Sequence, residues 1–154
     1  MIAARLNAEG LGREKGISRF VALVHTEGCG VAGAEAEALY ARSMLSYLTH
    51  PLVRFAVLLE HGCEKTHNDY MRNQLAERGL QADDFGWASV QLDGGIDKAG
   101  EKVVDWFEHR LAAIEPALPE SAGLQALRVG LLAAGPLSKD AAAALARLTR
   151  WLVG

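Results

Sequence analysis

Three side chains that can exchange protons or bind metals stand at alternate positions near the N-terminus. The segment that holds them reads His25, Thr26, Glu27, Gly28, Cys29 and Gly30. If the backbone is extended there, His25, Glu27 and Cys29 point to the same side. An imidazole, a carboxylate and a thiol on one side can bind a metal ion or perform acid–base catalysis. The residues alone fit equally well with a glycine turn that holds a small buried thiol beside a surface histidine and glutamate.

A second cluster of the same kind follows further along the chain. It comprises His61, Cys63, Glu64 and His67. Lone histidines and cysteines are more often structural than functional, but two such clusters after neighbouring strands are much less expected by chance. We therefore expect a functional site built from both loops. A thiol redox protein is the weaker alternative, because Cys29 and Cys63 form no Cys-x-x-Cys pair.

A pair of glycines opens a third loop of interest. Asp93, Gly94 and Gly95 precede a predicted helix. Free amide groups at a helix start favour an anionic group and glycines allow close approach, so a substrate carboxylate is one expected occupant. A plain turn with Asp93 as a hydrogen-bond acceptor is the alternative. The sequence has no GxGxxG or P-loop motif, which argues against nucleotide binding.

Four apolar runs alternate with helical patterns along the chain. Strands are predicted at residues 20–24, 55–59, 87–92 and 127–132, and helices at residues 34–48, 68–78, 97–113 and 138–152. Continuous apolar strands are typical of a parallel sheet that is buried on both faces. We therefore predict one α/β domain over residues 1–154, with a parallel sheet of about four strands and helices on both faces, a Rossmann-like, open three-layer sandwich. Right-handed crossovers would bring the loops at His25, His61 and Asp93 to one edge of the sheet.

Composition narrows the classes of partner. The net charge of −3 gives no reason to expect nucleic acid or an anionic membrane surface. No apolar run is long enough to span a bilayer, and the N-terminus lacks the apolar core of a signal peptide. Two cysteines in 154 residues are too few for a secreted disulfide scaffold. We expect a cytoplasmic protein.

The order of these motifs resembles the altronate/galactarate dehydratase family, over about residues 18–102. The residues that carry the resemblance are residues 25–30, His50-Pro51, Gly62-Cys63-Glu64, Gln91 and Gly94-Gly95. In that family a sugar acid loses water to give a 2-keto-3-deoxy acid, with a divalent metal such as iron. The resemblance implies the central domain of a hydro-lyase that binds a small-molecule sugar acid and Fe²⁺ or Mn²⁺.

The resemblance also suggests roles for individual residues. It implies catalytic roles for His25, Glu27 and Cys29, substrate binding by Gly30, Gln91, Gly94 and Gly95, and metal binding by Cys63 and Glu64. Dehydration beside a carboxylate needs a base to remove the α-proton and an acid or metal to assist loss of the β-hydroxyl. His25 and Glu27 are both candidates for the base, and the sequence does not choose between them.

The chain departs from the family pattern at three places. Leu52 stands where the family has asparagine after His-Pro, and Glu60-His61 stand where it has Gly-Leu. Residues 133–138 replace a Cys-Gly-Gly-Ser-Asp stretch, which removes a cysteine and an acidic residue from the expected active site. The family's N-terminal domain and most of its C-terminal domain have no counterpart. We therefore expect a piece of a larger dehydratase or a reduced relative of it.

These departures leave other functions open. A non-catalytic domain that binds a small acid or a partner would use the same loops without the missing active-site residues. A related sulfolactate-type lyase is a further alternative. The partners expected besides the sugar acid are a second copy of the chain, as a homo-oligomer, or the other domains of the parent enzyme.

Overall fold

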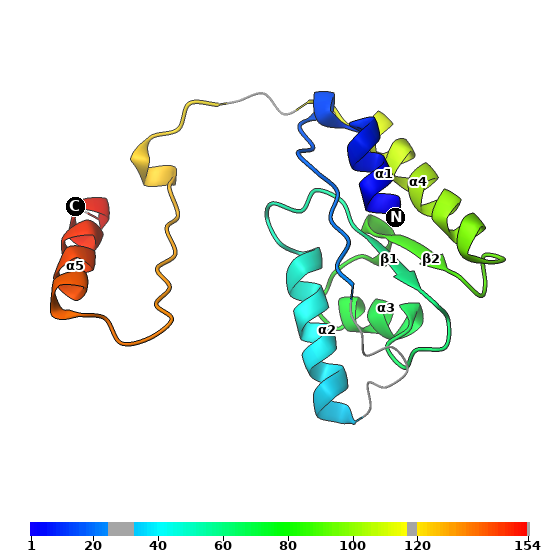
Figure 1. Ribbon diagram of the computed structural model, residues 1–154, viewed down its shortest axis with the longest axis horizontal. Helices are drawn as coiled ribbons and strands as arrows, with labels where there is room; N and C mark the ends of the chain where they lie inside the picture. The colour runs from blue at the N-terminus through cyan, green and yellow to red at the C-terminus, as the bar shows by residue number, and fades with distance from the viewer. Residues whose placement is uncertain (25–32, 117–119, 154) are drawn as a thin grey trace. The chain divides into compact units, whose positions relative to one another are not determined.

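A computed structural model describes residues 1–24, 33–116 and 120–153. The chain divides into two compact units, Met1–Ala117 and Leu118–Gly154, which are described separately (Figure 1). The first unit contains α1 (Ile2–Glu9), η1 (Arg13–Lys15), α2 (Ala34–Leu48), β1 (Val57–Glu60), α3 (Asn68–Ala76), η3 (Ala82–Asp84), β2 (Gly86–Ser89) and α4 (Ile96–Ala112). The second contains η4 (Leu124–Ala126) and α5 (Lys139–Val153). That residues 1–154 form one domain stays a prediction.

A small parallel sheet lies at the centre of the first unit. Strands β1 and β2 pair in register from Val57↔Gly86 to Glu60↔Ser89. Successive side chains of a strand point to opposite faces, so Leu58 and its neighbour Trp87 share one face and Gly86 lies on the other. Different helices pack against the two faces. The α/β class is therefore confirmed.

One face of the sheet is covered by α2 and α3. Their buried side chains Ala41, Leu45, Met71 and Leu75 form a cluster against which Leu58 and Trp87 pack. Helix α2 has the predicted bounds, 34–48, and α3 begins at the predicted residue and is followed by Gly79 in the left-handed region, with φ 70°. Left-handed φ after a helix is the usual role of glycine at that position.

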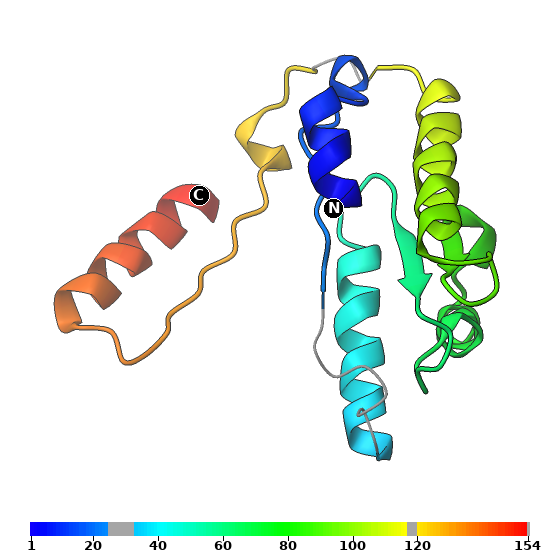
Figure 2. The same ribbon diagram turned by 45° about the vertical axis from the view of Figure 1, so that its right-hand side comes forward.

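The other face is covered by α4, which contacts both strands and is contacted in turn by α1 (Figure 2). The buried residues of this layer are Leu6, Ala99, Val103, Val104 and Leu111. Trp106 of α4 lies against Gly86, where the missing side chain leaves room for the indole. Two helical layers thus hold the strands between them and fix where β1 and β2 end.

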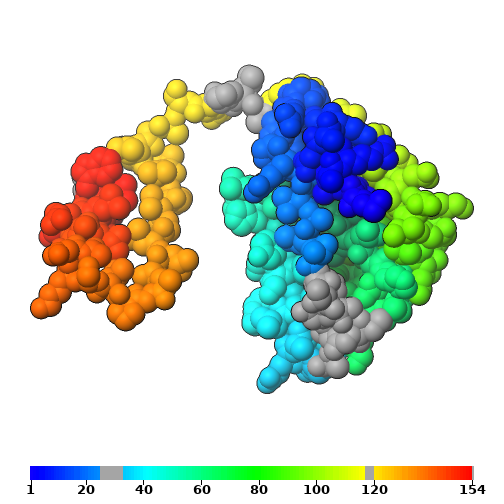
Figure 3. All heavy atoms as spheres, viewed as in Figure 1, coloured from blue at the N-terminus to red at the C-terminus, as the bar shows by residue number. Residues whose placement is uncertain are grey.

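The predicted strand at residues 20–24 does not form a ladder in the structure. These residues are extended but unpaired, and Val21, Leu23 and Val24 are exposed; Figure 3 shows this blue segment at the surface of the first unit. At the start of this segment, Asn7 Nδ2 donates to the carbonyl of Phe20 at 2.9 Å, and the Phe20 N–H donates to Asn7 Oδ1 at 2.7 Å. An asparagine side chain thereby takes the backbone groups that a strand neighbour would use.

The predicted strand at residues 127–132 is also absent. Its apolar residues Leu127, Val129 and Leu131 are each about half exposed, and no strand neighbour lies among the described residues of the second unit. Helix α5 follows nearly as predicted, and its start is capped by Ser138, whose Oγ accepts from the Ala141 N–H at 3.2 Å. A four-stranded, Rossmann-like sheet is therefore not confirmed. In the described part of the chain, no helix is long and apolar enough to cross a membrane.

Candidate functional site

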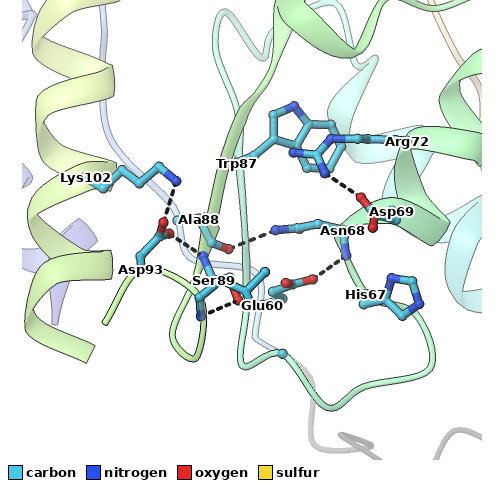
Figure 4. A pocket seen from close by; sticks show the side chains of 12 residues that line it. Glu60, His67, Asn68, Asp69, Arg72, Trp87, Ala88, Ser89, Asp93 and Lys102 are labelled. Carbon is cyan, nitrogen blue, oxygen red and sulfur yellow. Dashed lines mark hydrogen bonds and ion pairs between the residues drawn. The ribbon is translucent and has the colours of Figure 1, made fainter. Parts of the chain in front are cut away.

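A pocket of about 280 Å³ opens where β1 and β2 end (Figure 4). Its lining comes from the carboxyl ends of both strands, from the loops that follow them, and from α3 and α4. Two of the three loops that were expected to converge do so, because Gly62 and Asp93 line the same pocket. Ligands of open parallel sheets bind at this edge.

The centre of the pocket is tied together by Asn68, the first residue of α3. Its backbone N–H donates to a carboxylate oxygen of Glu60 at the end of β1. Its side-chain Nδ2 donates to the carbonyl of Ala88 in β2 at 3.0 Å. The bond to Ala88 is buried and the bond to Glu60 is partly buried, and together they hold α3 against the ends of both strands.

One wall of the pocket is an ion pair between Asp93 and Lys102 of α4. Lys102 Nζ lies 2.7 Å from Asp93 Oδ1, while Asp93 Oδ2 accepts from the Ser89 N–H at 2.7 Å. The ammonium group of Lys102, followed by the Ser89 amide, lowers the pKa of Asp93 below its ordinary value. Asp93 therefore ends β2 by binding its last amide and stays ionised beside the pocket.

The opposite wall is formed by Arg72 of α3 and Trp87 of β2. The guanidinium carbon of Arg72 lies 4.4 Å from the centre of the indole ring, and Arg72 Nη1 is 2.7 Å from Asp69 Oδ1. The indole is fixed in turn by its Nε1–H, which donates to the carbonyl of Ala82 at 2.8 Å. In Figure 4 the Arg72–Asp69 pair and the Lys102–Asp93 pair lie on either side of Asn68 and Glu60.

Glu64 holds the loop that follows β1. One carboxylate oxygen accepts from the His61 N–H at 2.5 Å and the other from the Gly62 N–H at 2.7 Å. Partial burial acts to raise the pKa of Glu64, but the amide hydrogen bonds of the loop outweigh it and lower the pKa below the ordinary value. In the described residues Glu64 thus acts on its own loop, and its proposed role as a metal ligand stays untested.

Replacing Glu64 with glutamine is expected to destabilise the protein by about 1 kcal/mol at neutral pH, because only one amide oxygen remains to accept from two N–H groups. The lowered pKa makes the wild-type contribution fully present above the ordinary glutamate pKa and lost as the pH falls through the folded-state pKa. Urea denaturation at about pH 7 and about pH 3 measures both effects. The gap between the two proteins should be smaller at the lower pH; an equal gap at both pH values would contradict this role.

Gln91 lies directly against the Gly62 loop. The Gln91 N–H donates to the carbonyl of His61 at 3.0 Å, which extends the contact between the two strands beyond their ends. A β-carbon on Gly62 would lie 2.9 Å from both Cβ and Oε1 of Gln91, and Gly62 has φ 115°. Only glycine fits at position 62, so two positions that the sequence placed in separate motifs are brought together.

Gly94 and Gly95 turn the chain from β2 into α4. Their φ angles are 87° and 108°, values that residues with a side chain rarely adopt. The Gly95 N–H donates to the carbonyl of Val90 at 2.8 Å, and Gly95 is the N-cap residue of α4 without a capping side chain. The glycine turn before α4 is built as predicted, and the docking of a substrate group on it stays a prediction.

Comparison with known protein families gives one match, to the family described as "D-galactarate dehydratase/Altronate hydrolase, second domain", over residues 1–115. The chain belongs to this family. The match covers the α/β unit and the whole pocket, and it confirms the family that the motif order indicated.

Among individual proteins, the chain is 33% identical over 99 residues to Ribonuclease 3 of Pseudoalteromonas translucida (strain TAC 125). That similarity covers 54% of this chain and 44% of the other protein, so the chain spans less than half the length of this relative. No solved structure matches the chain.

Four of the predicted site residues of this dehydratase-family chain fall outside the described residues. His25, Glu27, Cys29 and Gly30 all lie in residues 25–32. Cys63 is described: it is exposed, with Sγ 3.4 Å from Nδ1 of His61. The described residues contain no group of three or more histidine, cysteine, aspartate or glutamate side chains that fits a metal ion.

Several pocket residues were not expected from the sequence. They are Asn68, Asp69, Arg72, Ser89 and Lys102. In the sequence, Arg72 and Lys102 are not distinguished from other polar residues on helices. Only the packing of α3 and α4 beside the strand ends brings them to the pocket. Trp87 packs against the core cluster of α2 and α3 and also lines the pocket.

Proposed function

We propose that this chain is the central domain of a sugar-acid dehydratase, a hydro-lyase that removes water from an aldonic or aldaric acid. The product is a 2-keto-3-deoxy acid. The observation that carries the proposal is the polar pocket at the carboxyl ends of β1 and β2, within the region that matches the family. The pocket is suited to a small ligand, since sites for drug-sized molecules begin at about 300 Å³.

The elimination needs two proton transfers, one from the carbon next to the carboxylate and one to the hydroxyl that leaves the adjacent carbon. A base removes the proton next to the carboxylate, the C–O bond at the β-carbon breaks, and the leaving hydroxide takes a proton to become water. The resulting enol becomes the 2-keto acid by moving its hydroxyl proton to carbon. We assign the base to His25 or Glu27, a further acid–base role to Cys29, and substrate contacts to Gly30, Gln91, Gly94 and Gly95.

The described residues would bind and orient the substrate. Asn68, Ser89 and the carboxylates of Asp69 and Asp93 offer donors and acceptors for hydroxyl groups. Gly94 and Gly95 bring backbone close to the same edge. Preorganised groups of this kind contribute to catalysis by positioning the substrate rather than by chemistry.

We propose a divalent ion such as Fe²⁺ or Mn²⁺ only if residues 25–30 supply some of its ligands. The described residues do not fit an ion by themselves, since both oxygens of Glu64 bind loop amides. Cys63 would then need partners among His25, Glu27 and Cys29. The four-stranded sheet, association with further domains or a second copy, and a cytoplasmic location are likewise proposals that rest on the sequence.

A non-catalytic domain that binds small acids is the second candidate. Residues 133–138 favour it, because they lack the cysteine and the acidic residue of the family pattern. Ribonuclease activity is not carried over from the relative of that name. The net charge of −3, and three carboxylates against two cations around the pocket, give no electrostatic support for a phosphate backbone.

The dehydratase proposal is tested by incubating the purified protein with Fe²⁺ or Mn²⁺ and a panel of aldonic and aldaric acids. We expect a 2-keto-3-deoxy acid from at least one of them, detected chemically and by mass. Binding of an acid without any product would favour the non-catalytic domain. If no acid of the panel binds and none gives a product, the proposal is overturned.

A further inference from the structure

The charges around the pocket are unevenly matched. Among the described residues that line it, Glu60, Asp69 and Asp93 carry carboxylates, whereas Arg72 and Lys102 carry the positive charges. His67 caps α3, and its Nδ1 accepts the Tyr70 N–H at 3.3 Å. Among the aspartate, glutamate, arginine and lysine side chains of the lining, negative charges exceed positive charges by one.

Both positive groups are already engaged. Arg72 and Lys102 each lie 2.7 Å from a carboxylate oxygen, of Asp69 and Asp93 respectively. A carboxylate on a ligand would have to displace one of these partners to reach a cation. Glu60 is the pocket carboxylate that has no cationic partner among the described residues.

Glu60 also occupies the place that an anion would take. Anions bind at helix N-termini because the first amides point outward without partners. At α3 the amide of Asn68 donates to Glu60, and the amide of Tyr70 donates to His67. The chain thus supplies its own anion to this helix, from the last residue of β1.

We infer that Glu60 determines the substrate class of this pocket: it admits the hydroxylated chain of a sugar acid and disfavours a second carboxylate. The inference rests on the proposed dehydratase function. Of the two classes in that proposal, it selects aldonic acids, whose far end is a hydroxymethyl group, over aldaric acids. The carboxylate next to the reacting carbon binds outside this pocket, and hydroxyl groups meet Glu60, Asp93 and Ser89.

D-Galactonate and galactarate test the inference, because they differ only at C6, where one has a hydroxymethyl group and the other a carboxylate. Calorimetric titration of the full chain gives the ratio of their Kd values without requiring turnover. We expect galactonate to bind about tenfold more tightly, the effect of two unit charges roughly 6 Å apart in a partly solvated site. Glu60→Gln keeps an acceptor for the Asn68 amide and should bring the ratio close to one.

Two further variants separate a local charge effect from a general one. Asp69→Asn removes a more exposed pocket carboxylate and should change the ratio in the same direction by about twofold to threefold, since solvent screens it more. Glu108→Gln removes an exposed charge of α4 outside the pocket and should leave the ratio unchanged. Circular dichroism checks that each variant is folded.

The outcomes are distinguishable. Tighter binding of galactonate by the wild type, lost in Glu60→Gln and reduced in Asp69→Asn, would support the inference. Equal binding of both acids, or a ratio that Glu60→Gln leaves unchanged, would overturn it while leaving the dehydratase proposal intact. If neither acid binds to any of the proteins, the proposed function fails and the inference with it.

Discussion

Alanine in place of Gly86 is expected to lower the free energy of unfolding by about 1–3 kcal/mol, the usual cost of adding a methyl group to a packed core. Gly86 is buried in β2, and a β-carbon there would lie 2.6 Å from Val57 Cγ2 and 2.8 Å from the indole of Trp106. Neither neighbour yields easily: valine has few rotamers, and Trp106 packs edge-on against Phe55 and Phe107. Urea denaturation followed by circular dichroism measures the loss.

Gly100→Ala is the matched control for this prediction. Position 100 lies inside α4, where the nearest atom to a new β-carbon is Ile2 Cδ1 at 3.7 Å. The same added methyl group should there leave stability unchanged or raise it by up to about 1 kcal/mol, because alanine is the better helix former. Equal effects of the two substitutions would contradict the close packing of β1, β2 and α4 that positions the pocket.

Removing the proposed catalytic base is expected to give the largest loss of activity. Of the variants His25→Ala and Glu27→Gln, at least one should lower kcat for dehydration by about 10²–10⁴-fold, the usual contribution of a positioned general base. The Kd of the sugar acid should change far less, because the base acts on a C–H bond that contributes little to binding. Steady-state kinetics with a 2-keto acid assay, together with calorimetry, separate the two effects.

His109→Ala serves as the control, since His109 is an exposed residue of α4 and does not line the pocket. It should retain wild-type kcat. If both His25→Ala and Glu27→Gln kept wild-type activity, the assignment of the base to residues 25–30 would be wrong, whatever the function of the pocket.

Helices α2, α3 and α4 were predictable because their boundaries are set by local chemistry, whereas α1 was not predicted from the sequence. The apolar spacing of α2 and the His50-Pro51 pair after it fix its range, and Gly79 follows α3 as expected. The strands were less predictable, because an apolar run becomes a strand only when a neighbour is free to pair. Nothing in the periodicity around Phe20 indicates that Asn7 takes its backbone hydrogen bonds.

The residues of the candidate site were likewise predictable only in part from the sequence. Gly62 and Gly94 were recognisable, because turns with positive φ require glycine. Arg72 and Lys102 were not, since single cations on polar helix faces are common, and their place beside the pocket follows from how α3 and α4 pack on the strands. In the sequence, Glu60 was notable only because it departs from the family pattern. In the structure its carboxylate accepts a hydrogen bond from the Asn68 N–H.

We propose that a sugar acid binds at the carboxyl ends of β1 and β2. Titration of ¹⁵N-labelled protein with D-galactonate, followed by amide chemical shifts, tests it most directly. We expect the largest changes at the amides of Gly62, Asn68 and Gly95 and at the indole N–H of Trp87, with little change in α5. Chemical-shift changes confined to α1 or to residues 120–153, or no changes at millimolar acid, would contradict binding at the carboxyl ends of β1 and β2.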